Sequence, residues 1–150
     1  MAVARASTRV ELPPEEAYAL WVDHARWPTF IDGFGRVDRV DDSWPHEGAK
    51  LVWSGVPGGR GVVTERVVRA LPPREHEVNV FEEKLDGTQR TTFTADEDGT
   101  IVELELDYKV SVGGPLRPLV DALFIRRAQN DALARTLRRF RTEAAEQAAL

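Results

Sequence analysis

A long amphipathic stretch at residues 114–148 constrains the fold of this chain more than any other feature. When these residues are placed at 100° intervals around a helix, apolar side chains fall within about 60° of one line along most of its length. The pattern predicts a single C-terminal helix of about 45–50 Å whose apolar face must pack against another layer. The residues of this stripe are Leu116, Leu119, Val120, Leu123, Ala134 and Leu137.

Two polar residues, Arg127 and Asn130, interrupt the stripe, at about 40° and 20° from its centre. A polar group on a buried face needs a partner or water. One possibility is a buried pair satisfied by a backbone carbonyl or by a strand carboxylate such as Glu65. Arg127 could also extend its charged end out of the groove. The third possibility is a cavity in which both residues orient the polar end of an apolar ligand.

The region before this helix consists of strands and turns. Alternation is clearest at residues 101–112, where apolar side chains from Val102 to Val112 share one face and charged side chains occupy the other. Residues 61–70 show no clear alternation, so their inward-facing side chains are not assigned. Further strands are predicted at residues 3–12, 37–40, 49–54, 61–70, 75–83 and 89–95, with turns at the glycine-rich residues 55–61 and at Asp86-Gly87.

Two short helices are expected after the first strand. Pro14 followed by Glu15 and Glu16 is a helix-start signal, and a second helix can begin at Pro28. The resulting order is one strand, two short helices, six strands and a long helix. This order predicts an α+β fold in which an antiparallel sheet of about seven strands has one face covered by the terminal helix.

Composition narrows the classes of protein that this chain can represent. Its 150 residues fit one domain, residues 1–150, and the hydrophobic share of 42% is typical of globular proteins. The net charge of −5 argues against a general nucleic-acid binder. We find no apolar segment of signal-peptide or membrane-spanning length. We therefore expect a cytoplasmic protein without a transmembrane segment, either a monomer or a homodimer.

The sequence contains no recognisable metal or nucleophile motif. There are no cysteines, and His24, His46 and His76 are not spaced as metal ligands, so they are interpreted as surface or loop residues. No Gly-x-Ser-x-Gly nucleophile elbow is present. We expect neither a metal site nor a cofactor.

The element order resembles the START-like, or SRPBCC, superfamily, and most closely its polyketide cyclase/dehydrase family. The segment from Trp27-Pro28 through Phe30 to Val40 is similar to a conserved stretch of that family, and residues 61–66 and the helix after Gly113-Gly114-Pro115 support the resemblance. The resemblance implies a Bet v 1/START-like helix-grip fold, a curved antiparallel sheet around the C-terminal helix with a cavity between them. Members include aromatase/cyclases, lipid carriers and receptors.

The expected function is therefore to bind a hydrophobic small molecule, aromatic polyketide-like or lipid-like, in this cavity. The alternative is a protein-interaction module with the same fold, an exposed apolar patch and a filled interior. The candidate ligand-binding residues are Trp27, Phe30, Trp53, Phe81, Phe93, Tyr108, Phe124, Arg127 and Asn130.

Catalysis of the cyclase, aromatase or dehydrase type would need groups that polarise a carbonyl and move protons. If the protein is such an enzyme, Arg127 would hold a developing enolate oxygen, Tyr108 would donate a proton and Asn130 would orient the substrate. Glu65 could act as the base only if its side chain points inward.

Overall fold

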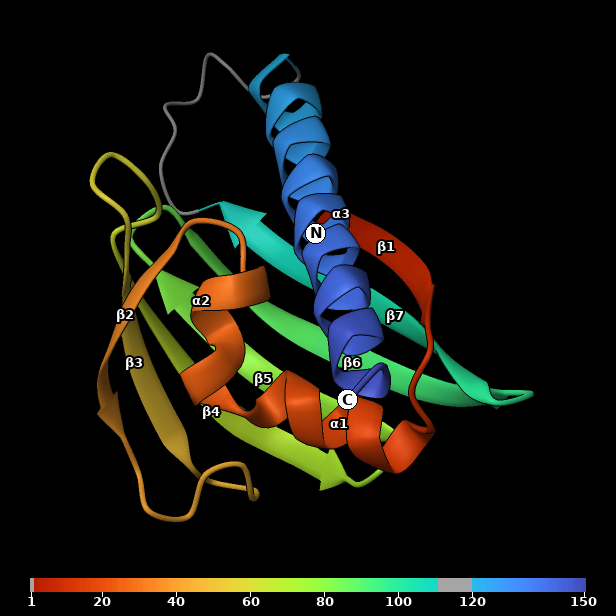
Figure 1. The fold of residues 1–150 in the computed structure, drawn as a ribbon. Coiled ribbons are helices and arrows are strands. Elements are labelled where there is room, and N and C mark those ends of the chain that lie inside the picture. The colour runs from red at the N-terminus through yellow and green to blue at the C-terminus, as the bar shows by residue number, and fades with distance from the viewer. Residues whose placement is uncertain (1, 111–119) are drawn as a thin grey trace.

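The computed structural model describes residues 2–110 and 120–150, without the side chains of residues 120–122. Seven antiparallel strands form one curved sheet in the order β1-β7-β6-β5-β4-β3-β2, and the long helix α3 lies against one face of it (Figure 1). The helix-grip fold predicted from the sequence is confirmed. The strands are β1 (Ala2–Val10), β2 (Phe34–Val40), β3 (Lys50–Gly55), β4 (Val62–Leu71), β5 (Glu75–Glu82), β6 (Leu85–Asp96) and β7 (Gly99–Val110).

Two short helices close one end of the sheet, as expected. Helix α1 (Pro14–Val22) begins at a proline followed by two glutamates, and α2 (Trp27–Phe30) follows a 3-10 turn at His24–Arg26. Proline favours the first helical turn because its missing N–H would have no partner there. The paired rings of Trp21 on α1 and Phe30 on α2 pack against Phe140 of α3 and join this end to the core.

The alternation predicted at residues 101–112 is present in β7, where Val102, Leu104, Leu106 and Tyr108 are buried. Val112 lies outside the described residues. The predicted turn at Asp86-Gly87 is wrong, because both residues lie inside β6 and the hairpin turns between Glu82 and Leu85. A Cβ on Gly87 would lie 2.6 Å from the Asp107 carbonyl oxygen, so this glycine permits close strand pairing rather than a turn.

Helix α3 (Val120–Ala148) is rich in alanine and arginine, which favour helices. Its buried face differs from the predicted stripe by about a quarter of a turn. Of the predicted stripe, Leu137 is buried and Ala134 partly buried, whereas Leu123 is 66% exposed. Leu116 and Leu119 lie outside the described residues. The side chains that are buried on α3 are Leu133, Thr136, Leu137, Phe140 and Ala144.

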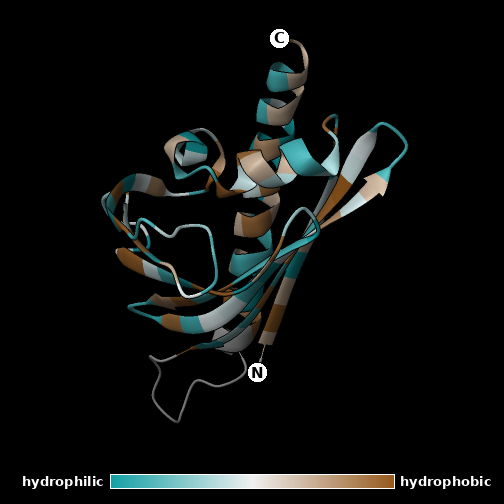
Figure 2. Cartoon of the chain, turned by 90° about the horizontal axis from the view of Figure 1, so that it is seen from below, coloured by the Kyte–Doolittle hydropathy of each residue, from teal (hydrophilic) through white to brown (hydrophobic). Residues whose placement is uncertain are grey.

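The prediction erred because it gave equal weight to the residues at the start of the stripe. In Figure 1 the first turns of α3 extend beyond the sheet, and Leu123 and Phe124 are exposed there. Apolar side chains in these turns therefore do not indicate which face of α3 packs against the core. The hydropathy view shows hydrophilic and hydrophobic residues alternating along α3, as in an amphipathic helix (Figure 2).

Substitutions on α3 test this orientation. Phe140→Ala, at a fully buried ring, should lower the free energy of unfolding by about 3–5 kcal/mol because it leaves a cavity. Leu123→Ala, at an exposed side chain, should change it by no more than about 0.5 kcal/mol. Urea unfolding at neutral pH measures both. Equal effects at the two positions would contradict the observed orientation of α3.

Candidate functional site

A cavity of about 220 Å³ lies between the sheet and α3. Its floor is formed by alternating inward side chains of neighbouring strands, and its roof by one face of α3. The end near the short helices is formed by Trp21, Ile31 and Asp32. The strands contribute Trp53, Arg60 from the adjacent loop, Glu65, Val80, Gln89, Leu104 and Leu106, and α3 contributes Gln129, Ala132, Leu133, Arg135 and Thr136.

Glu65 is the acidic side chain that the sheet directs into this cavity. On β4 the inward positions are Val63, Glu65 and Val67, and both valines are fully buried. The indole Nε1 of Trp53, on the neighbouring strand β3, donates a hydrogen bond of 2.8 Å to Glu65 Oε2. Among the described residues this is the one side-chain hydrogen bond of Glu65, so its second oxygen is left to interact with an occupant of the cavity.

Burial raises the pKa of the Glu65 carboxyl, and the Trp53 hydrogen bond and the charge of Arg60 only partly oppose this shift. A raised pKa means that the neutral, protonated carboxyl persists to higher pH than in water. The group can then donate a hydrogen bond to a ligand oxygen when protonated, and accept a proton when ionised. These are the properties of a general acid or base.

A smaller hollow of about 20 Å³ adjoins the cavity, and Glu65 and Gln89 line both spaces. Its polar walls include His76 on β5 and Thr91 on β6, which are paired across the two strands and buried. This volume is sufficient for about one water molecule, and the surrounding polar groups could bind it.

His76 is not a surface or loop residue as the sequence suggested. The alternation of β5 places it inward with Val78 and Val80, and its ring packs edge-on against Tyr18 and Trp44. Its Nε2 lies 3.2 Å from the Pro45 carbonyl oxygen. Burial lowers the pKa of His76 to about 4, so the imidazole is neutral at physiological pH.

Arg60 lies where the cavity meets a second, outer pocket. Its Nε donates a hydrogen bond of 2.7 Å to Glu82 Oε2, and its guanidinium carbon lies 5.0 Å from the centre of the Trp53 ring. The outer pocket has a volume of about 440 Å³ and shares Arg60 and Gln129 with the inner cavity. Arg60 and Gln129 therefore separate two neighbouring spaces.

The opposite side of the inner cavity is closed by contacts between Asp32 and α3. The Asp32 carboxylate accepts two hydrogen bonds from Arg135, of 3.0 and 3.1 Å, and the Asp32 N–H donates to Thr136 Oγ1 at 2.9 Å. These bonds hold the turn after α2 against the helix.

Of the predicted aromatic residues, Trp53 lines the inner cavity and Trp27 lines the small hollow. Phe30 and Phe93 are buried in the core, where Phe30 contacts Phe140 and Phe93 contacts Tyr18. Tyr108 faces inward and is 2% exposed. Its hydroxyl forms no well-aligned hydrogen bond among the described residues, and it is not among the side chains that line the inner cavity.

Four further predicted ligand-binding residues lie away from the cavity, on the surface or at the sheet edge. Phe81 is on the outer face of the sheet and 45% exposed, and Phe124 on α3 is 74% exposed. Arg127 is exposed, contrary to the expectation that it lies on the buried face. Asn130 accepts a hydrogen bond of 2.9 Å from the Arg5 N–H, so it satisfies the backbone of the edge strand β1.

Sequence reasoning missed Arg60, His76 and Gln89. Arg60 lies in a glycine-rich turn that gave no sign of contact with the interior. An alternation signal was present in β5, where His76, Val78 and Val80 are two residues apart. In β6 the polar Gln89 and Thr91 hid the inward face, because they stand between the apolar Leu85 and Phe93 and break the alternation.

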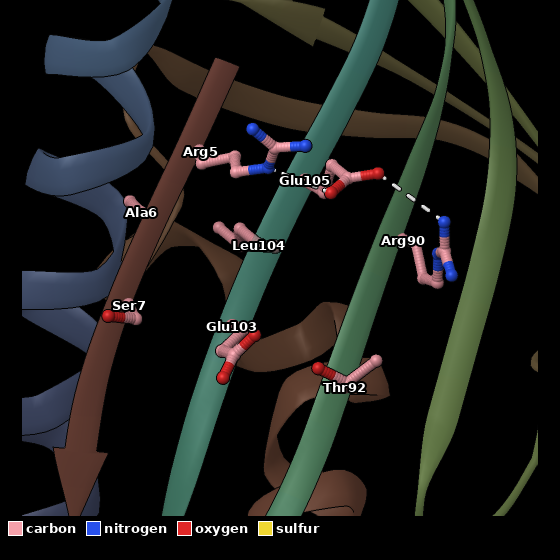
Figure 3. A pocket seen from close by; sticks show the side chains of 8 residues that line it. All are labelled: Arg5, Ala6, Ser7, Arg90, Thr92, Glu103, Leu104 and Glu105. Atoms are coloured by element: carbon pink, nitrogen blue, oxygen red, sulfur yellow. Dashed lines mark hydrogen bonds and ion pairs between the residues drawn. The ribbon is translucent and has the colours of Figure 1, made fainter. Parts of the chain in front are cut away.

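A separate hollow, of about 510 Å³, lies on the outer face of the sheet over β1, β7 and β6 (Figure 3). Glu105 forms ion pairs there with Arg5 at 2.9 Å and Arg90 at 3.3 Å. Because these charges pair with one another in solvent, the hollow lacks the apolar enclosure of the inner cavity. Among the described residues no cluster of His, Cys, Asp and Glu could hold a metal ion, and no helix is long and apolar enough to cross a membrane.

The buried imidazole predicts a specific pH dependence of stability. A histidine with a lowered folded pKa stabilises the fold above its unfolded pKa of 6.5, and this contribution is lost as pH falls toward about 4. In His76→Gln the free energy of unfolding should therefore fall less steeply between pH 6.5 and about pH 4 than in wild type. His46→Gln, at an exposed histidine, should show the same dependence on pH as wild type. Denaturant unfolding at a series of pH values measures this. Parallel curves for wild type and His76→Gln would contradict the assignment.

Comparison with solved structures supports the same fold. The chain resembles the di-domain ARO/CYC StfQ of the steffimycin biosynthetic pathway, with a TM-score of 0.76, 16% identity and coverage of 99% of this chain and 52% of that one. It also resembles a protein of Thermus thermophilus, with a TM-score of 0.72, 15% identity and coverage of 95% and 97%. A norcoclaurine synthase point mutant from Thalictrum flavum gives a TM-score of 0.70, 13% identity and coverage of 97% and 95%.

No curated protein matches the chain at a significant level. A family model does match, over residues 1–145, and it describes polyketide cyclase/dehydrase and lipid transport proteins. Because this match spans nearly the whole sequence, the chain belongs to the polyketide cyclase/dehydrase and lipid transport family.

Proposed function

We propose that this protein binds a hydrophobic small molecule, aromatic polyketide-like or lipid-like, in the cavity between the sheet and α3. The observation that carries the proposal is Glu65, a carboxyl group with one oxygen held by Trp53 and the other available inside a cavity lined by both apolar and polar side chains. Ligand pockets typically combine apolar walls with a few convergent polar groups. Here Gln89 on the floor and Thr136 on the roof are polar side chains that line the cavity together with Glu65.

The proposal extends to cyclase- or dehydrase-like chemistry, with Glu65 as the acid or base. Its ionised carboxylate would take a proton from a carbon beside a substrate carbonyl, and the electron pair of the broken C–H bond would form the enolate. In a cyclisation the enolate carbon would attack a second carbonyl of the substrate, forming a C–C bond as the C=O π bond breaks, and the Glu65 carboxyl would give the proton to that oxygen, which remains as a hydroxyl. In a dehydration the enolate would form a C=C bond as a C–O bond breaks, and the carboxyl would protonate the departing hydroxide to water. Glu65 is suited to both steps because burial raises its pKa. Arg127 and Tyr108 have no catalytic role in this proposal, because neither lines the cavity.

The alternative, a protein-interaction module, is favoured by the exposed side chains of Phe81, Leu123 and Phe124. It also calls for a filled interior, whereas the inner cavity of this protein has a volume of about 220 Å³. The container proposal therefore accounts for more of the structure. Residence in the cytoplasm as a monomer or homodimer stays a prediction.

Two alanines on α3 provide a matched test of binding in the cavity. Ala132 lines it, whereas Ala128 is exposed one turn earlier. Ala132→Phe should fill the cavity and weaken binding of the aromatic probe 1-naphthol by at least about tenfold, and Ala128→Phe should leave the affinity unchanged. Fluorescence titration measures the dissociation constants, and circular dichroism confirms that both variants fold. Equal affinities for the two variants would place the probe outside the cavity.

Glu65→Gln separates a catalyst from a carrier, because it keeps the size and hydrogen-bonding capacity of the side chain but cannot exchange the proton. A cyclase-like enzyme should keep its affinity within about threefold but lose at least about 100-fold in turnover. The substrate to use is the compound identified by native mass spectrometry of protein purified from its cells, followed by extraction of the bound molecule. Unchanged turnover would exclude Glu65 as the acid or base.

A further inference from the structure

We propose that Arg60 is a specificity-determining residue that binds the oxygen-bearing end of an elongated ligand extending from the inner cavity into the outer pocket. This inference rests on the proposed function, because it takes the inner cavity as the place of the ligand's apolar body. It adds a second subsite and the class of ligand, a long apolar molecule that ends in a carbonyl or carboxylate oxygen.

The volumes of the two spaces are the first argument. The inner cavity, about 220 Å³, is below the range of about 300–1,000 Å³ that is common for pockets enclosing a small-molecule ligand. The outer pocket, about 440 Å³, adjoins it and shares Arg60 and Gln129 as walls. Both spaces together are within the common range, so a ligand of ordinary size must pass the Arg60 side chain.

The hydrogen-bonding state of Arg60 is the second argument. A guanidinium has five N–H donors in a planar fork, and in Arg60 the Nε donor is used by Glu82. Among the described residues, no side chain accepts a hydrogen bond from its two terminal nitrogens. The bond to Glu82 and the Trp53 ring beneath it hold the fork in place, and its four terminal N–H groups, which no described side chain accepts, can donate to a ligand oxygen.

The charge around this position is the third argument. Glu82, whose side chain is 8% exposed, already compensates the charge of Arg60, so the site does not require an anion. A neutral carbonyl can accept a hydrogen bond from the guanidinium as a carboxylate does, although more weakly. The structure therefore assigns Arg60 to an acceptor oxygen, and the experiment distinguishes a carbonyl from a carboxylate.

The test compares three probes by titration with wild type and Arg60→Met, which keeps the length of the side chain but removes its donors. Dodecanoate is a long apolar chain that ends in a carboxylate, and 2-tridecanone is a similar chain with a ketone next to its end. The third probe, 1-naphthol, is small enough to occupy the inner cavity alone. Arg60→Met should weaken dodecanoate or 2-tridecanone, or both, by at least about tenfold, and 1-naphthol by less than about threefold. Loss of dodecanoate alone identifies a carboxylate site, and loss of both probes identifies a site for any acceptor oxygen.

Arg66→Met is the matched control, because Arg66 is an exposed arginine on β4 that lines neither the inner cavity nor the outer pocket. It should change every affinity by less than about threefold. An effect on dodecanoate equal to that of Arg60→Met would show general attraction of anions and overturn the role of Arg60. The role of Arg60 would also be overturned if Arg60→Met bound the two long-chain probes as wild type does, or if wild type bound neither of them. In both cases, binding of 1-naphthol would still support the proposed function. A wild-type protein that binds none of the three probes would contradict both proposals.

Discussion

The interior of this protein is organised around the hydrogen bond between Trp53 and Glu65. A carboxyl group among aromatic and aliphatic side chains is costly to bury unless a partner compensates it. Here the indole N–H supplies that partner, and the Arg60 guanidinium lies above the same indole ring. The bond depends on the pairing of β3 with β4, in which Leu51 lies opposite Glu65 and Trp53 opposite Val63. A one-residue shift of β4 would turn Glu65 to solvent and remove the polar group from the cavity.

Helix α3 turns this polar floor into an enclosed space. Leu137 and Phe140, both fully buried, fix its C-terminal half to the sheet and the short helices. Toward the cavity the helix presents Leu133 together with the small side chains of Ala132 and Thr136, which leave room that larger apolar residues would fill. Asn130 then attaches the helix to the free edge of β1. The same element therefore packs tightly at one end and covers a cavity at the other.

The element order and the sheet were predictable because they depend on local patterns, such as the alternation in β7 and the proline and glutamates that start α1. The phase of α3 was not predictable from apolar residues alone, because Leu123 lies in turns that run past the sheet. Nor was the inward direction of Glu65, since valines occupy both faces of β4. Arg60 lies in a loop, and the conformation of that loop brings its side chain to the cavity. Loops have no periodic sequence pattern from which this position could be predicted.

The central claim is that an apolar ligand lies beside Glu65, between the sheet and α3. Intermolecular nuclear Overhauser effects between 1-naphthol and isotope-labelled protein test it most directly, because they report which side chains lie next to the probe. The account predicts contacts to Trp53, Val80 and Leu133, which line the cavity on both layers. Contacts confined to the exposed side chains of Phe81, Leu123 and Phe124 would contradict it.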